Sequence, residues 1–188
     1  AEAFGEASAG VPMTAATRLQ AASISKPMTA LAALALADET GTGWDEDLRP
    51  QLGGFVPPGD DGAPRYTLRR LLTHSAGLGV DGFPGYAVGT PVPTLRQVLE
   101  GAPPANTQAV RPEQAPGSFR YSGGGTSLVQ WWMQQRAAQP DFARLMQQRL
   151  LRPLGMTESH FEQPPRDGAP ATPYAHGHVD GQPLPGGH

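Results

Sequence analysis

Glycine and proline set the strongest limit on what this chain can fold into. The sequence holds 24 glycines and 21 prolines among 188 residues, a level close to that at which chains lose fixed structure. These residues are concentrated in four connecting stretches, Gly53–Pro64, Gly77–Pro93, Gly101–Gly117 and Pro164–Gly187. Because clear apolar segments lie between the stretches, the sequence predicts a folded domain with long ordered loops, and such loops often carry function.

The apolar segments predict a mainly helical chain. The longest, from Ser23 to about Ala37, has leucines among alanines on every side, and a helix that is apolar all round is expected to lie buried at the centre of a domain. Ser23 is a good N-terminal residue, and Pro27 falls in the first turn, where a missing N–H costs least. Further helices are predicted over Leu68–His74 after Thr67, Leu95–Glu100 after Thr94, Thr126–Ala137, and Phe142–Leu151 with Asp141 as its cap.

Strands are expected to be a minor component. Short segments around a Gly-Val-Pro turn near the start favour two strands, about Ala3–Ser8 and Arg18–Ala21, and a small further contribution is expected near the end. A pair of strands needs more sheet or a helix to pack on.

Composition excludes several classes of protein. A net charge of −3 and the lack of a basic cluster give no reason to expect nucleic-acid binding. The longest apolar run, Ala30 to Ala37, is far too short to span a bilayer. The absence of cysteine excludes disulfides, thiolate metal sites and a cysteine nucleophile. No signal peptide is found in the sequence as given.

Lys26 is the only lysine, beside 13 arginines. Lysine can lose its proton in a suitable environment, whereas arginine cannot, and a general base must exist without its proton. Ser23 lies three residues earlier, on the same helix face, so Ser23-x-x-Lys26 places a hydroxyl beside an amine that could activate it. The alternative is that a single lysine survived the compositional bias by chance.

A second motif surrounds Tyr121 in the segment PGSFRYSGGG, residues 116–125. A tyrosine at a junction between a loop and a helix can relay protons. The alternative is a partly buried tyrosine that caps a glycine turn. The three glycines do not form a phosphate loop, because no Gly-Lys-Ser or Gly-Lys-Thr follows them.

Two other clusters are weaker candidates. Ser75 lies in THSAG, residues 73–77, which is not a G-x-S-x-G nucleophile motif because a threonine takes the first glycine's place. His74 is expected to be a hydrogen-bonded structural histidine at a helix end. A second cluster could bind zinc, but it lacks a third ligand at helical spacing and lies in a stretch rich in glycine and proline, so no metal site is predicted. Its members are His176, His178, Asp180 and His188.

The order of four motifs carries a resemblance to a known family. Ser23-x-x-Lys26, LLTHSAGL (71–78), PGSFRYSGGG and LLRPLGMTESHF (150–161) follow one another along the chain. This order resembles the serine β-lactamase and penicillin-binding-protein superfamily, and most closely its class C-like branch. That branch includes class C β-lactamases, D-alanyl-D-alanine carboxypeptidases, D-aminopeptidases and related serine esterases.

The resemblance implies a fold and a set of roles. The fold is α+β, of the β-lactamase/transpeptidase type, present over residues 1–188 as its N-terminal, mostly helical part with an incomplete antiparallel sheet. Ser23 resembles the acyl-accepting nucleophile, and Lys26 its activating partner. Tyr121 resembles the tyrosine of a Tyr-x-Asn motif that assists proton transfer. No cofactor is implied.

The chain also departs from the family pattern. Gly123 takes the place of the asparagine that would contact the substrate's acyl side, so Gly123 is a candidate substrate-binding position. The departure favours an esterase or an unassigned serine hydrolase over a β-lactamase. The Lys-Thr-Gly or His-x-Gly strand of the family is not found, since the segment 176–178 comes too soon. We therefore expect a C-terminal fragment or a second chain to complete the sheet, and a donor missing from the oxyanion hole costs roughly 10²–10³ in rate.

Two functions follow as expectations. The first is a serine hydrolase that acts through an acyl-enzyme on an amide, ester or β-lactam carbonyl of a small or peptide-like substrate. The alternative is a non-catalytic module that binds a peptide or a partner on the same scaffold. Because relatives in the superfamily are mostly exported, the resemblance implies a periplasmic or secreted protein.

Overall fold

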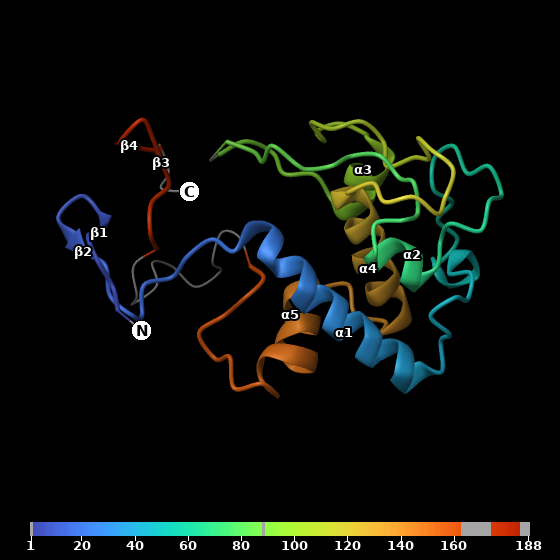
Figure 1. Cartoon of the computed structure of the whole chain (residues 1–188), viewed down its shortest axis with the longest axis horizontal. Coiled ribbons are helices and arrows are strands. Elements are labelled where there is room, and N and C mark those ends of the chain that lie inside the picture. The colour runs from blue at the N-terminus through green and yellow to red at the C-terminus, as the bar shows by residue number, and fades with distance from the viewer. Residues whose placement is uncertain (1, 88, 163–173, 185–188) are drawn as a thin grey trace. The chain divides into compact units, whose positions relative to one another are not determined.

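The computed structural model describes residues 2–87, 89–162 and 174–184, and it divides the chain into two compact units (Figure 1). The terminal unit consists of Ala1–Ser25 and Glu162–His188, and the helical unit of Lys26–Phe161. The terminal unit thus joins the two ends of the sequence, while one uninterrupted stretch of chain forms the helical unit.

The described part of the terminal unit contains two short antiparallel hairpins. Strand β1 (Glu6–Ser8) pairs with β2 (Val11–Pro12), and β3 (His178–Val179) pairs with β4 (Gln182–Pro183). The predicted minor strand component at both ends of the chain is therefore confirmed.

The second predicted strand, over residues 18–21, is wrong. Gly10 has a φ of +72°, which lets the chain reverse directly after β1, so the partner strand follows at once. Arg18 instead forms an isolated parallel bridge with Tyr174, and the His176 N–H donates to the Ala7 carbonyl at 2.7 Å. These contacts join the two ends of the sequence within the terminal unit.

The long helix begins two residues later than predicted. A 3₁₀ turn, η1 (Ala22–Ile24), precedes the α-helix α1 (Ser25–Thr40). Pro27 explains the shift: with Ser23 as the cap, Pro27 would have to supply an N–H to the Ser23 carbonyl, and proline has none. A start at Ser25 places Pro27 among the first residues, whose N–H groups need no partner within the helix.

Helix α1 is buried along one face and not all round. Its buried residues recur at helical spacing, and the opposite face is open, with Leu31 49 % exposed. The expectation of a helix buried on every side was wrong because alanine and leucine occur on both faces of the helix, so apolar composition alone does not show which face is buried. The buried residues are Thr29, Ala32, Ala33, Leu36 and Ala37.

The other helices lie close to the predicted positions, and each predicted cap is confirmed. Thr67, Thr94 and Asp141 accept the backbone N–H of Arg70, Gln97 and Arg144 respectively. The helices are α2 (Leu68–Leu72), α3 (Leu95–Glu100), α4 (Gly123–Arg136) and α5 (Phe142–Met146), with a π-helical segment η3 (Gln147–Leu151) directly after α5 and a 3₁₀ turn η2 (Arg49–Gln51) before α2.

Helix α4 is the centre of the helical unit. It packs against α2, α3, α5 and η2, and Figure 1 shows it beside α2 and α3. Trp132, with no exposed surface, and Met133 lie at the middle of the core. The start of α4 is thereby held in place from several sides, and Tyr121 lies two residues before it. Among the described residues, none of the helices has both the length and the apolar composition to cross a membrane.

Candidate active site

Lys26 and Tyr121 lie together in the helical unit. Lys26 is the second residue of α1, and its Nζ atom lies 5.0 Å from the centre of the Tyr121 ring. An ammonium at this distance is attracted by the electrons of the ring. Tyr121 is 37 % exposed, so its side chain lies partly at the surface. The structure thus brings together two of the residues that the sequence singled out for proton transfer.

Ser23 belongs to the terminal unit. It is the middle residue of η1 and is exposed to solvent. The sequence predicted that Ser23 would cap the long helix, whereas the α-helix begins two residues further on. Its role as the nucleophile stays a prediction.

The start of α4 is docked on the backbone of residues 79–81. The Ser122 hydroxyl caps the helix by accepting the Gly125 N–H at 2.8 Å and itself donates to the Gly79 carbonyl at 2.8 Å. The Gly123 N–H donates to the Asp81 carbonyl at 3.1 Å, and the Gly124 N–H donates to the Val80 carbonyl at 3.0 Å. These four hydrogen bonds fix the backbone immediately after Tyr121.

Gly123 contributes shape and no hydrogen-bonding group to the site. Its N–H is already bound to the Asp81 carbonyl. A Cβ atom at this position would lie 3.0 Å from that carbonyl oxygen and 3.2 Å from the ring of Phe83. The asparagine of the family pattern would therefore require the Asp81 carbonyl or the ring of Phe83, which is 39 % exposed, to move by a few tenths of an ångström.

His74 is a neighbour of Tyr121 that the sequence did not connect with it. The sequence predicted a hydrogen-bonded histidine at a helix end, which is confirmed, since the ring Nδ1 accepts the Ser122 N–H at 3.2 Å. The ring centres of His74 and Tyr121 are 4.5 Å apart, with the planes inclined by 38°. The signal available in the sequence was the position of His74 in the second ordered motif, but no pattern predicts which ring it contacts.

The surroundings of His74 favour its neutral form. Burial and the nearby positive charge of Lys26 hold the pKa of His74 below its ordinary value. Because the Ser122 N–H is a donor, Nδ1 must carry no proton, and the hydrogen of the neutral ring lies on Nε2. Lys26 thus acts on His74 through its charge and contacts the face of the Tyr121 ring.

Charged and apolar groups border this cluster. The Arg120 guanidinium, next to Tyr121 in sequence, donates to the Glu113 carboxylate and lies 3.8 Å from Asp81. Phe119 packs edge-on against His74 with ring centres 6.0 Å apart, yet it is 73 % exposed. The face around Tyr121 is thus aromatic, with an ion pair on one side.

The weaker candidates do not gain from the structure. The Ser75 hydroxyl is 2.9 Å from that of Thr73, another hydroxyl and not a base. No group of three His, Asp or Glu residues that could hold a metal is found within residues 2–87, 89–162 and 174–184. His188, a member of the cluster that was considered for zinc and not predicted to bind it, lies outside the described residues.

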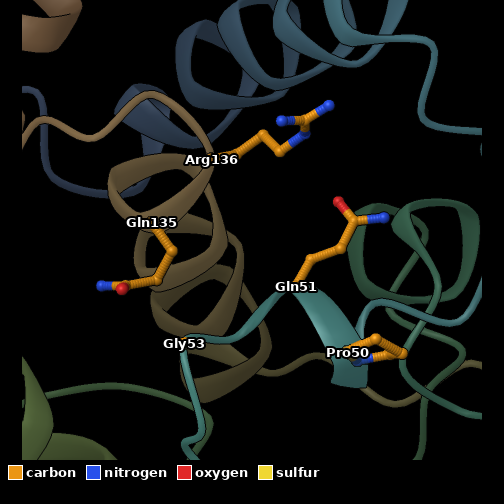
Figure 2. Close-up of a pocket in the computed structure, with 5 residues that line it drawn as sticks. All are labelled: Pro50, Gln51, Gly53, Gln135 and Arg136. Carbon is orange, nitrogen blue, oxygen red and sulfur yellow. The ribbon is translucent and has the colours of Figure 1, made fainter.

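An open pocket of about 450 Å³ lies at the far end of α4. Figure 2 shows two of its lining residues, Gln135 and Arg136, on the last turn of that helix. Its polar groups have structural partners, since Gln51 accepts the Trp132 indole N–H and Arg136 donates to the Thr40 carbonyl, both at 2.9 Å. The 14 residues of α4 place it about 20 Å from the Tyr121 end. The pocket is lined by Pro50, Gln51, Gly53, Gln135 and Arg136.

Comparisons with known proteins identify the family. The family model for Beta-lactamase matches residues 1–188. The chain belongs to the beta-lactamase family. The resemblance carried by the four ordered motifs is therefore confirmed, and so is the α+β fold of the β-lactamase/transpeptidase type, because the similar solved structures share it.

Three relatives illustrate the range of the beta-lactamase family. Esterase EstB from Burkholderia gladioli is 36 % identical over 86 residues, which cover 42 % of this chain and 20 % of EstB. EstCE1, a hydrolase with promiscuous acyltransferase activity, is 26 % identical, and its structure gives a TM-score of 0.70. The match covers 96 % of this chain and 49 % of the EstCE1 chain. The octameric penicillin-binding protein homologue from Pyrococcus abyssi is 26 % identical with a TM-score of 0.70, and the match covers 94 % of this chain and 40 % of the homologue. The chain thus spans less than half the length of these relatives.

Proposed function

We propose that this chain carries the nucleophile-bearing part of a serine hydrolase that acts through an acyl-enzyme on an amide, ester or β-lactam carbonyl. The contact between Lys26 and Tyr121, with 5.0 Å between Nζ and the ring centre, is the observation that carries the proposal. An amine and a tyrosine that lie side by side supply two groups that can take up the proton a nucleophilic hydroxyl must lose. Membership of the beta-lactamase family supports this reaction class.

The roles in the reaction follow from the chemistry of each group. The Ser23 oxygen attacks the carbonyl carbon and forms a C–O bond, while its proton passes to the pair of Lys26 and Tyr121. The bond to the leaving group then breaks, and the leaving group takes up that proton. Water, activated by the same pair, hydrolyses the acyl-serine ester and restores the Ser23 hydroxyl.

Among the carbonyl substrates, we propose an ester. At Gly123 the family pattern would place an amide beside the acyl group, and here the nearest side chain is the Phe83 ring. An apolar wall favours an apolar acyl group, because the site then has no buried amide to satisfy. The names of two relatives, an esterase and a hydrolase with acyltransferase activity, agree with this choice.

Because the chain spans less than half of its relatives, we propose that further chain, in the same polypeptide or in a partner, completes the sheet around the site. The observation behind this is the pair of two-stranded hairpins in the described part of the terminal unit, since sheets this small are marginal without further strands or a helix to pack on.

Hydrolysis of p-nitrophenyl butyrate by the wild type and three variants tests the proposal. Ser23→Ala removes the nucleophile, and Lys26→Arg keeps the charge but not the ability to act as a base. We expect both to lower kcat/KM by about 10²-fold or more, whereas Ser25→Ala, which removes the adjacent hydroxyl of the same helix start, should lower it by less than threefold. Hydrolysis retained in Ser23→Ala contradicts the proposal, and absence of turnover in the wild type favours the binding module.

A further inference from the structure

His74 contacts the segment around Tyr121 at three points. Its carbonyl oxygen accepts the N–H of Arg120 at 2.7 Å, and its ring Nδ1 accepts the N–H of Ser122 at 3.2 Å. Between these two residues, the Tyr121 ring packs on the imidazole with 4.5 Å between the ring centres. One residue therefore holds the backbone on both sides of Tyr121 and also supports the face of its ring.

The backbone of His74 is unusual for a residue with a side chain. Its φ is +55°, in the left-handed region that favours glycine and, to a lesser degree, asparagine. A glycine here would relieve the strain but could neither accept the Ser122 N–H nor support the ring. Strained backbone of this kind persists where the surrounding contacts require it, and it is frequent at functional sites.

The charged groups around His74 come from three elements. Lys26 approaches from α1 and lowers the His74 pKa by its charge. From the segment before α4 come Arg120, whose guanidinium binds Glu113, and the phenol of Tyr121 itself. Arg70 lies on α2, the helix that precedes His74. Of these groups, Lys26 is the one whose charge acts on His74, so a proton on His74 would add a second positive charge beside that lysine.

We propose that His74 is a positioning residue for Tyr121 that acts as the neutral imidazole with its hydrogen on Nε2 and releases Tyr121 when it is protonated. This inference rests on the proposed role of Tyr121 in proton transfer. Protonation places a hydrogen on Nδ1, directly opposite the Ser122 N–H, so the hydrogen bond is lost. The repulsion between imidazolium and Lys26 acts in the same direction. Neither step requires His74 to touch a substrate.

Three variants separate positioning from charge. His74→Asn keeps an acceptor oxygen near the place of Nδ1 and tolerates the left-handed backbone, but it does not titrate. His74→Ala removes both the acceptor and the ring. His178→Asn, in the exposed strand β3 of the terminal unit, is the matched control, because it makes the same substitution at a histidine away from Tyr121.

Nuclear magnetic resonance of the 188-residue chain between pH 4.5 and 8 tests the proposal without relying on activity. In the wild type we expect the Nε2–H tautomer of His74 at high pH, and the Ser122 amide and the Tyr121 ring should shift together with one midpoint below the ordinary histidine value. The shift should vanish in His74→Asn and be unchanged in His178→Asn. A Ser122 amide or Tyr121 ring that does not titrate in the wild type, or that still titrates in His74→Asn, overturns the proposal.

Kinetic constants show whether the contact of His74 with Tyr121 affects the catalysed reaction. For p-nitrophenyl butyrate, His74→Ala should lower kcat by about 10²-fold, the size of effect that a small misplacement of a catalytic group produces, and leave KM within twofold. His74→Asn should recover most of this loss and lack the wild type's decline at low pH. A rise in KM with kcat unchanged would contradict a positioning role. If the wild type shows no turnover, the proposed function fails, and the resonance measurement alone decides the role of His74.

Discussion

Gly124 and Gly125 are neighbours in the first turn of α4, but only one of them has room for a side chain. A Cβ atom on Gly124 would lie 2.7 and 2.8 Å from the two methyl groups of Val110 and 2.9 Å from the Gly79 carbonyl. The nearest atom to a Cβ on Gly125 would be 3.5 Å away, an ordinary contact. The run of three glycines is therefore explained at Gly124 by close packing against a loop, and at Gly125 no such contact demands glycine.

Alanine substitutions test this difference. Gly124→Ala should lower the free energy of unfolding by about 1–3 kcal/mol, because the backbone must shift to admit the methyl group. Gly125→Ala should raise the same quantity by up to about 1 kcal/mol, because alanine is a better helix former. Urea denaturation followed by circular dichroism measures both. A Gly124→Ala variant as stable as Gly125→Ala would show that the helix start is not docked as described.

Single residues were predicted from the sequence where their chemistry is rare in this chain. Lys26 was singled out because it is the only lysine, and Tyr121 because of its motif, and the structure places the two in contact. The contact of His74 with Tyr121 could not be predicted, because it depends on how the segment before α4 lies across the end of α2. The space around Gly123 is likewise set by a loop some 40 residues earlier, residues 80–83.

At the scale of elements, helix ends were predictable where a capping side chain fixes them. Thr94 forms a capping box with Gln97, and α3 has the predicted bounds. The start of α1 was placed two residues too early because the serine at position 23 outweighed the constraint imposed by Pro27. Long loops gave no such signals, and their structure depends on contacts between distant segments.

Arg65 makes contacts of this kind between distant segments, so its substitution should lower the stability of the fold considerably. The side chain is buried, and its guanidinium donates to the carbonyls of Ala76 and Gln114 at 2.8 and 3.0 Å and to Asp61 at 2.6 Å. It thereby joins three loop segments next to α2. Arg65→Met should lower the free energy of unfolding by about 2–4 kcal/mol, because the buried Ala76 carbonyl and the partly buried Gln114 carbonyl lose their donor.

Asp61→Asn is the matched control for Arg65→Met. The Asp61 side chain is 52 % exposed, and asparagine keeps an oxygen that can accept from the guanidinium, so its loss of stability should be much smaller. Thermal unfolding of the two variants side by side measures the difference. Equal losses would mean that the ion pair with Asp61, and not the two carbonyls, carries the stabilisation.

For the whole molecule, the order of the motifs predicted the family, which no single helix or strand could do. Four short motifs in sequence order predicted the family, and the family match over residues 1–188 confirms it. The mostly helical fold with small hairpins is also as expected. The burial of α1 on one face only was not expected, because an alanine-rich sequence does not distinguish a central helix from one that covers a core. The family fold is thus predictable, while the geometry of the site depends on contacts between loops.

The central claim is that Ser23 is an activated nucleophile, and covalent labelling tests it most directly. The 188-residue chain is incubated with a fluorophosphonate, its intact mass is measured, and the adduct is located by peptide mapping. We expect one adduct, on Ser23, that is absent in Ser23→Ala and strongly reduced in Lys26→Arg. An unlabelled chain, or an adduct on Ser75 or another residue in place of Ser23, would contradict it.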